Sequence, residues 1–284
     1  MVRLSALLAA LSSLCGPCQA AVAVASHYTS TPTQVRLVSI YPHNTSAFTE
    51  GFFFLDGTVV ESTGLERQSF IRQYKLANPA ELHGVFDPEI FGEGIACIDD
   101  KIYALTYKHN KILVLSKYDL KLLATHPFHT VTGEGWGMTT NGSHLIVSDG
   151  SATIQFYDPQ NFKRVFSIDV MSPSTGEKVN QLNELEFVDG EILANVWFKN
   201  VILRIDPDDG RVIEELDLDW VPAMVPNVVA MSDIHMRGEA VMNGIAFNPK
   251  NRHVYITGKL WDSIFELELS YLSDRRGVAS KQNT

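Results

Sequence analysis

The sequence predicts an all-β fold, a five-bladed β-propeller with four-stranded antiparallel blades. Short runs of alternating apolar and polar residues fill the chain from Gln34 to Leu269, broken by Asp-Gly and Asn-Gly turns, and helical periodicity is scarce. One sequence unit also recurs five times, at intervals of 43, 41, 49 and 60 residues. A recurrence of about 40–50 residues built from strands alone is typical of a β-propeller.

Each unit opens with a short block that has Glu or Asn at its second position, then Gly or Glu, then an apolar residue. These second positions are Glu50, Glu93, Glu134, Asn183 and Asn243. A second strand pair follows each block. Four of these strand pairs align without gaps, and in each of them one position lies five residues before an isoleucine. The residues at this position are Tyr107, Asp149, Trp197 and Lys259, and the first unit has Thr63 near the equivalent place. Equivalent residues of propeller repeats lie at the same radius, so we expect two rings around the central channel.

The connections follow from the same pattern. Residues Val35 to Tyr41 are predicted to supply an outer strand that closes the ring. The longest interval contains a Pro- and Met-containing segment from Trp220 to Ala240, predicted to be a loop or short helix over one face. We expect a single propeller domain over residues 35–271, preceded by a flexible linker at 24–34 and followed by a disordered tail at 272–284.

The first 23 residues are predicted to be a secretory signal peptide. Arg3 precedes an apolar run from Leu4 to Leu14, and Ala21-Val22-Ala23 fits an A-x-A cleavage pattern. The Cys15-Gly16-Pro17-Cys18 motif lies inside this segment and lacks the strand and helix that a redox pair needs. We therefore expect an exported protein without a membrane segment, located in the secretory pathway, the vacuolar lumen or outside the cell, or in the periplasm if the source is bacterial.

Composition limits the partners. The 23 basic and 33 acidic residues give a formal net charge of −10, which disfavours a nucleic-acid partner. After cleavage Cys97 is the one remaining cysteine, so no internal disulfide is expected. Two N-glycosylation sequons begin at Asn44 and Asn141, and these predict a glycoprotein if the source is eukaryotic.

The second ring points to a binding site. Its members include aromatic residues, a carboxylate, an amine and a hydroxyl, a mixture typical of an apolar pocket with a few placed polar groups. Structural roles are the alternative: Glu50 and Glu134 as caps of backbone N–H groups, Trp136 and Trp197 as packing residues, and Lys259 as a counter-charge. No hydrolase motif, phosphate-binding loop or zinc pair is found in the sequence, and no catalytic metal is expected.

Nine blocks in order resemble the plant and bacterial (papaya-type) glutaminyl-peptide cyclotransferases. Together they span about Ile40 to Leu267. The blocks are Phe48-Thr49-Glu50-Gly51, Val60-Glu61-Ser62-Thr63-Gly64, Phe91-Gly92-Glu93-Gly94-Ile95, Gly133-Glu134-Gly135-Trp136-Gly137, Ser148-Asp149-Gly150-Ser151, Leu182-Asn183-Glu184-Leu185-Glu186, Ala194-Asn195-Val196-Trp197, Asn243-Gly244-Ile245-Ala246 and Thr257-Gly258-Lys259-Leu260-Trp261.

The resemblance implies a five-bladed propeller that converts N-terminal glutamine of peptides or proteins to pyroglutamate and releases ammonia. It implies that no metal cofactor is required for catalysis; a structural divalent cation remains open, and we expect a monomer. It assigns the central acidic role to Glu93. The matching pocket positions are Phe48, Glu50, Phe91, Tyr107, Trp136, Asn183, Trp197 and Lys259. Two positions depart from the family pattern, which usually has Gln at position 50 and Trp at position 107.

The chemistry is consistent with these residue types. A carboxylate can take a proton from the substrate amine and return it to ammonia, aromatic walls can hold the side chain folded, and Asn183 or Lys259 can stabilise an oxyanion. Glu50 either raises the pKa of a neighbouring acid or binds the cationic amine. Two other classes stay open: a calcium-dependent lactonase or esterase propeller, and a non-catalytic binding scaffold.

Overall fold

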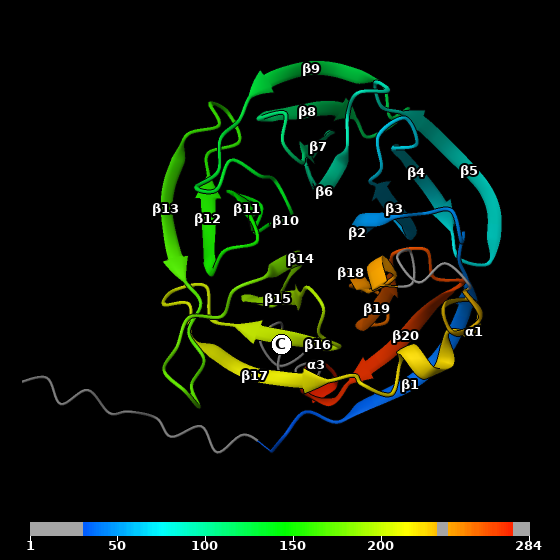
Figure 1. Ribbon diagram of the computed structural model, residues 1–284, viewed down its shortest axis with the longest axis vertical. Helices are drawn as coiled ribbons and strands as arrows, with labels where there is room; N and C mark the ends of the chain where they lie inside the picture. Colours follow the sequence, from blue (N-terminus) through cyan, green and yellow to red (C-terminus); the bar gives the residue numbers. More distant parts are fainter. Residues whose placement is uncertain (1–30, 232–237, 275–284) are drawn as a thin grey trace, which may run out of the picture. The chain divides into compact units, whose positions relative to one another are not determined.

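The computed structural model describes residues 31–231 and 238–274. The predicted signal peptide and most of the predicted linker and tail lie outside these residues. The described chain forms five four-stranded antiparallel sheets arranged as the blades of a ring (Figure 1). The prediction of an all-β, five-bladed propeller is therefore confirmed. None of the helices within the described residues has the length and apolar character needed to cross a bilayer.

The strands run outward in sequence order in four of the blades. Blade 1 contains β2 (Thr49–Leu55), β3 (Thr58–Thr63), β4 (Phe70–Lys75) and β5 (Asn78–Val85). Blade 2 contains β6 (Gly92–Ile98), β7 (Lys101–Thr106), β8 (Lys111–Ser116) and β9 (Leu122–Pro127). Blade 3 contains β10 (Met138–Thr140), β11 (Leu145–Val147), β12 (Thr153–Tyr157) and β13 (Arg164–Asp169). Blade 4 contains β14 (Leu182–Val188), β15 (Glu191–Val196), β16 (Val201–Ile205) and β17 (Val212–Asp217).

Blade 5 joins the two ends of the described chain. It contains β18 (Met242–Asn248), β19 (His253–Gly258), β20 (Ser263–Leu269) and, as its outer strand, β1 (Val35–Pro42). In Figure 1 the blue β1 lies along the red β20, and the two pair from Val35↔Leu269 to Pro42↔Ser263. The predicted closing strand is confirmed, and it extends one residue beyond Tyr41.

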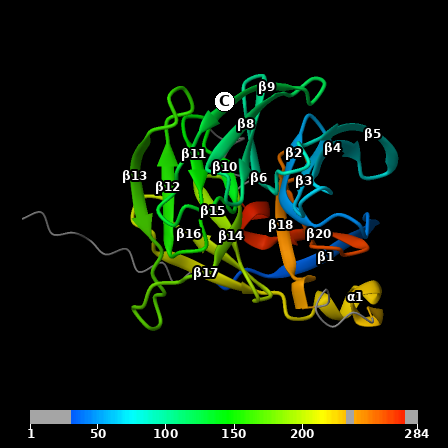
Figure 2. The ribbon, with the colours of Figure 1, turned by 45° about the horizontal axis from the view of Figure 1, so that its top comes forward.

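The described residues between blades 4 and 5 include the short helices η1 (Pro222–Met224) and α1 (Pro226–Ala230). Both ribbon views place α1 beside blade 5 (Figures 1 and 2), where the Asn227 side chain donates to the carbonyl of Leu260. The prediction of a loop or short helix between Trp220 and Ala240 is confirmed for the residues described there.

Described residues on both sides of the predicted domain, 35–271, contact the propeller. Helix α3 (Ser270–Asp274) continues beyond residue 271, and Leu272 is fully buried in the core. Thr33, placed in the linker by the sequence prediction, donates both its backbone N–H and its hydroxyl to Glu214. These are contacts that a boundary drawn from composition does not detect.

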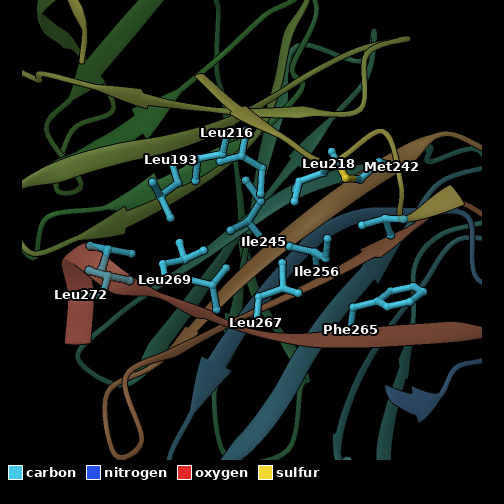
Figure 3. Packing of buried hydrophobic residues seen from close by; sticks show 14 of the residues in the cluster. Leu193, Leu216, Leu218, Met242, Ile245, Ile256, Phe265, Leu267, Leu269 and Leu272 are labelled. Atoms are coloured by element: carbon cyan, nitrogen blue, oxygen red, sulfur yellow. The ribbon is translucent and has the colours of Figure 1, made fainter. Parts of the chain in front are cut away.

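Hydrophobic clusters lie between neighbouring blades and hold them together. Between blades 4 and 5, Leu193 and Leu216 face Ile245, Ile256 and Leu267, as Figure 3 shows. Comparable clusters lie between the other blade pairs. Because both faces of most inner strands are covered in this way, those strands are buried over most of their length.

The register of blade 3 corrects the sequence alignment. In blades 2, 4 and 5 the inner strand has a register shift, and the second position of the repeat block lies two residues before the first pair that follows the shift. In blade 1, Glu50 lies within the shift itself, between the paired residues Thr49 and Gly51. In blade 3, Met138 pairs with Val147, so the equivalent residue is Trp136 and not Glu134. The first ring is therefore Glu50, Glu93, Trp136, Asn183 and Asn243.

The second ring needs a related correction. In blades 2, 4 and 5 the last residue of the second strand pairs with the first residue of the inner strand. The residue that comes directly after this pair is Tyr107, Trp197 or Lys259, respectively. The equivalents in blades 1 and 3 are Gly64 and Gly150 rather than Thr63 and Asp149. A Cβ at Gly64 would lie 2.3 Å from the Phe91 ring, and one at Gly150 would lie 2.6 Å from the Trp136 ring. Glycine is needed at both positions because the aromatic side chain of the neighbouring ring occupies the space.

Candidate active site

All nine residues singled out from the sequence line one cavity of about 370 Å³. Every blade contributes: Phe48 and Glu50 from blade 1, Phe91, Glu93 and Tyr107 from blade 2, Trp136 from blade 3, Asn183 and Trp197 from blade 4, and Lys259 from blade 5. They meet because an inner strand begins, and its antiparallel neighbour ends, at the same end of each blade.

A buried ion pair forms one side of the cavity. Lys259 Nζ donates to Glu50 Oε1 at 2.6 Å, and Asn243 Nδ2 donates to Glu50 Oε2 at 3.2 Å. The Lys259 ammonium also lies 4.5 Å from the centre of the Phe48 ring. Burial raises the pKa of Glu50 to about 7, against the opposing effect of Lys259. Asn243 itself does not line the cavity; it holds Glu50 in place.

Glu93 presents a nearly buried carboxyl group to the same cavity, with 5% of the residue exposed. Burial, and then the negative charge of Glu50, raise the pKa of Glu93 well above its usual range, while Lys259 opposes this shift. Desolvation and a like charge are the two causes that move a carboxyl pKa upward. A carboxyl group with a raised pKa is suited to accept and return a proton during a reaction.

Aromatic rings form the walls. The indoles of Trp136 and Trp197 meet edge to face with centroids 5.4 Å apart. Phe91 lies 5.5 Å from Tyr107 and 6.2 Å from Phe48 between ring centroids. Such aromatic pairs prefer tilted or edge-to-face geometry, and they give the cavity a rigid apolar lining.

Two polar atoms near the cavity have no partner within the described part of the chain. They are Asn183 Oδ1, an acceptor, and Trp197 Nε1, a donor, and both are buried. An unsatisfied buried polar atom costs about 1–3 kcal/mol, so each is available for a ligand group. The acceptor suits an ammonium or amide N–H group, and the donor suits a carbonyl oxygen.

Besides Asn243, three ring candidates lie outside the cavity lining. Glu134 is absent from the cavity lining, and its carboxylate accepts the Trp136 indole N–H at 3.1 Å. Asp149 instead accepts the Gln155 side-chain amide at 2.9 Å within blade 3. Thr63 hydrogen-bonds the backbone of Phe70.

Two lining residues were missed by the sequence analysis, namely Leu65 and Glu239. Both come from connecting segments outside the repeated blocks, so the repeat comparison had no equivalent positions to compare. Among residues 31–231 and 238–274, no group of three or more His, Cys, Asp or Glu side chains is arranged to hold a metal ion.

Comparison with known proteins finds similarity over most of the chain. A family model described as glutamine cyclotransferase matches residues 7–269. The glutaminyl-peptide cyclotransferase of Arabidopsis thaliana is 32% identical over 247 residues, covering 86% of this chain and 74% of the relative. The crystal structure of Myxococcus xanthus glutaminyl cyclase superposes with a TM-score of 0.74 at 32% identity, covering 83% of this chain and 96% of that one.

Proposed function

The chain belongs to the glutamine cyclotransferase family, and from this premise we propose how its cavity carries out the reaction. The protein is a glutaminyl-peptide cyclotransferase, which converts the N-terminal glutamine of a peptide to pyroglutamate with release of ammonia. The observation that supports the mechanism best is the single cavity in which a buried, proton-binding Glu93 faces aromatic walls.

The reaction is an internal acyl transfer. The substrate α-amine attacks its own γ-carboxamide carbon, a C–N bond forms, and the original amide C–N bond breaks. The amine must lose a proton and the departing nitrogen must gain one, so one group can serve both steps. No oxidant, reductant or external water is consumed.

Glu93 is the proton shuttle in this proposal. As a carboxylate it accepts the proton of the substrate ammonium, and as a carboxylic acid it returns that proton to the leaving ammonia. General acid–base catalysis of this kind contributes about 10²–10⁴-fold. The raised pKa of Glu93 supports this role, because it brings the proton affinity of the carboxylate closer to the proton affinities of the substrate amine and of ammonia.

The aromatic walls supply orientation. Two aromatic pairs confine a side chain of glutamine size: Trp136 with Trp197, and Phe91 with Tyr107. When the substrate amine and the γ-carbonyl are held in contact, a flexible side chain is kept in a near-attack geometry for ring closure. The tyrosine at position 107 keeps an aromatic face where relatives usually have tryptophan.

The polar anchors divide between amine and carbonyl. The unpaired Asn183 Oδ1 is an acceptor and so binds the substrate amine, rather than the oxyanion as the sequence analysis supposed. The donors Trp197 Nε1 and Lys259 stabilise the oxyanion that develops on the γ-carbonyl. Glu50 acts indirectly by holding Lys259 and by raising the proton affinity of Glu93.

A Glu93→Gln variant tests the central role. We expect a folded protein whose release of ammonia from a Gln-initiated dipeptide falls by about 10²-fold or more, because the amide cannot accept the proton. Wild-type and variant unfolding temperatures are compared to confirm folding. Turnover near the wild-type rate would contradict the role of Glu93.

The same assay with and without EDTA separates the enzyme classes. We propose that catalysis needs no metal, so ammonia release by the wild-type protein is expected to be unchanged by the chelator. A calcium-dependent lactonase or esterase would lose activity in EDTA and release no ammonia. A scaffold propeller would release none under either condition.

Export, glycosylation and a monomeric state complete the proposal. Asn44 and Asn141 are exposed, and each side-chain oxygen accepts a backbone N–H two residues ahead, which leaves room for a glycan on the amide nitrogen. Secreted material from a eukaryotic host, treated with an endoglycosidase, is expected to lose mass at these sites. Mass spectrometry of the mature N-terminus locates the cleavage near Ala23.

A further inference from the structure

We propose that Glu134 is a positioning residue, which fixes the Trp136 indole in the substrate cavity and ties it to the Tyr107 wall. The inference rests on the cyclotransferase function and on the roles proposed for the cavity walls. It concerns a residue that lies outside the cavity and does not touch the reacting atoms.

The two carboxyl oxygens of Glu134 have different partners. Oε2 accepts the Trp136 indole N–H at 3.1 Å, and Oε1 lies 3.2 Å from the Lys108 ammonium. The Glu134 backbone is itself held, because the Thr130 hydroxyl donates to its carbonyl at 2.6 Å. The carboxylate is therefore a fixed anchor rather than a freely rotating surface group.

Trp136 depends on this anchor for its orientation. Its ring packs on Gly150, where a Cβ would lie 2.6 Å from the indole, and meets Trp197 edge to face. Within the described residues, the hydrogen bond to Glu134 is the polar contact of its indole N–H. Losing that bond would remove the polar restraint on the indole ring, so a change in ring orientation would alter the width of the slot for the glutamine side chain.

Lys108 connects the anchor to the aromatic wall of the neighbouring blade 2. Its ammonium lies 4.5 Å from the centre of the Tyr107 ring, a cation–π contact, while pairing with Glu134. One carboxylate thus joins a wall of blade 3 to a wall of blade 2. The Lys108 side chain is 61% exposed, so this link is weaker than the indole bond.

Glu134 also adds negative charge near Glu93. The charged groups around Glu93 are Glu50 from β2, Lys259 after β19 and Glu134 before β10, with Glu239 elsewhere in the lining. Burial and Glu50 raise the pKa of Glu93 most, and Glu134 raises it further. Positioning and charge are therefore two separable effects of the same side chain.

Two variants, Glu134→Ala and Glu134→Gln, separate the positioning effect of this side chain from its charge effect. Alanine removes both effects, whereas the glutamine amide oxygen still accepts the indole N–H but carries no charge. For Glu134→Ala we expect KM for a Gln-peptide to rise on the order of tenfold, as for loss of a hydrogen bond to a charged group. For Glu134→Gln we expect KM within about threefold of wild type, as for a neutral hydrogen bond that is kept.

The Trp136 indole resonance supplies a readout that a general loss of stability would not move. The protein has four tryptophans, so the indole N–H region of a ¹H–¹⁵N spectrum is simple, and Trp136→Phe identifies the signal. The signal should move upfield in Glu134→Ala and stay near its place in Glu134→Gln. In both variants the acidic limb of kcat/KM against pH should move to lower pH, because a negative charge near Glu93 is gone.

Two control variants complete the experiment. Lys108→Met should leave the Trp136 resonance in place and raise KM by less than about fivefold, as expected for an exposed pair. Glu177→Ala removes an exposed carboxylate that lines no part of the cavity, and it should change none of the readouts.

The proposal is overturned if Glu134→Ala keeps the wild-type KM and indole resonance, or if Glu134→Gln is as impaired as Glu134→Ala. Absence of ammonia release by the wild-type protein would instead contradict the cyclotransferase function. The two failures are thus distinguishable.

Discussion

Glu50 is the residue at which this chain differs most informatively from its family pattern. Its carboxylate pairs with Lys259, lines the same cavity as Glu93 and raises the pKa of that residue. The sequence analysis left two roles open, a like-charge effect on a neighbouring acid or a grip on the substrate amine. The 2.6 Å contact with Lys259 favours the first, because a carboxylate already paired with an ammonium is less available to a second one.

Glu50→Gln therefore tests a charge effect. Removing this carboxylate should lower the pKa of Glu93, since one like charge is lost and Lys259 keeps its own. Glu93 works as a base in the free enzyme, so the acidic limb of kcat/KM should move to lower pH, measured with a Gln-dipeptide. Glu239→Gln is the matched control within the cavity lining, and a smaller shift is expected there. An acidic limb that stays in place or moves upward would contradict the interpretation.

At the residue scale the sequence predicted the composition of the cavity but not its contacts. All nine candidate residues meet because each belongs to a repeated block, and repeats place equivalent positions at one radius. Glu239 and Leu65 could not be predicted in this way, since they lie in connections that have no counterpart in other blades. The pairing of Glu50 with Lys259 depends on side-chain conformation, which block spacing does not determine.

At the scale of elements, blade 3 shows how a repeat can be aligned in the wrong register. Gly133-Glu134-Gly135 and Gly135-Trp136-Gly137 are both glycine-flanked triplets, and the first contains the carboxylate found in blades 1 and 2. Residue identity favoured the first, but strand pairing selects the second. The interval from Glu93 to Trp136 is 43 residues, the same as from Glu50 to Glu93. Spacing was thus a better guide than residue type.

Blade 1 contains a buried charge network centred on Glu61 of β3. The carboxylate accepts two hydrogen bonds from Arg72, one from Thr49 and one from Tyr74, and lies 2.9 Å from His43 Nε2. Burial alone would raise the pKa of Glu61, but His43 and Arg72 outweigh it and lower the pKa to about 2. Since His43 follows β1, the network links the closing strand to blade 1.

We expect Glu61→Gln to lower the free energy of unfolding by about 3–5 kcal/mol, because it leaves a buried Arg72 without its counter-charge. Urea unfolding at pH 7 measures this. Glu268→Gln is the control: its partner Arg36 is largely exposed, and a loss below about 1 kcal/mol is expected. Equal losses in the two variants would contradict the assignment.

The same network makes stability depend on acid. The Glu61 pKa is lower in the folded chain than its ordinary value of 4.5, so its contribution is complete above about pH 4.5 and is lost as the pH falls towards about 2. The Glu61→Gln variant lacks this contribution, so its unfolding free energy should fall less steeply than that of the wild type over that range.

At the scale of the whole molecule, ring closure depends on one strand from the N-terminal side. β1 pairs with β20 along its length, and Thr33 extends the connection to Glu214 and Arg204 of blade 4. Without β1 the edge of β20 would present unpaired backbone groups, a template for aggregation.

A chain that begins at His43 tests this dependence against one that begins at Pro32. We expect the shorter chain to unfold at a temperature lower by on the order of 10 °C, which corresponds to a loss of about 3 kcal/mol or more for a domain of this size. It should also aggregate at concentrations where the longer chain does not, as measured by light scattering. Equal unfolding temperatures would show that β1 is dispensable for closure.

The composition of the cavity wall has a consequence for inactivation. Because all five blades contribute to it, no fragment and no partly opened ring contains a complete set of catalytic groups. Ammonia release is therefore a direct reporter of the closed ring. On heating, the half-life of activity should equal the half-life of the fold, so the working lifetime of the enzyme is set by its unfolding rate.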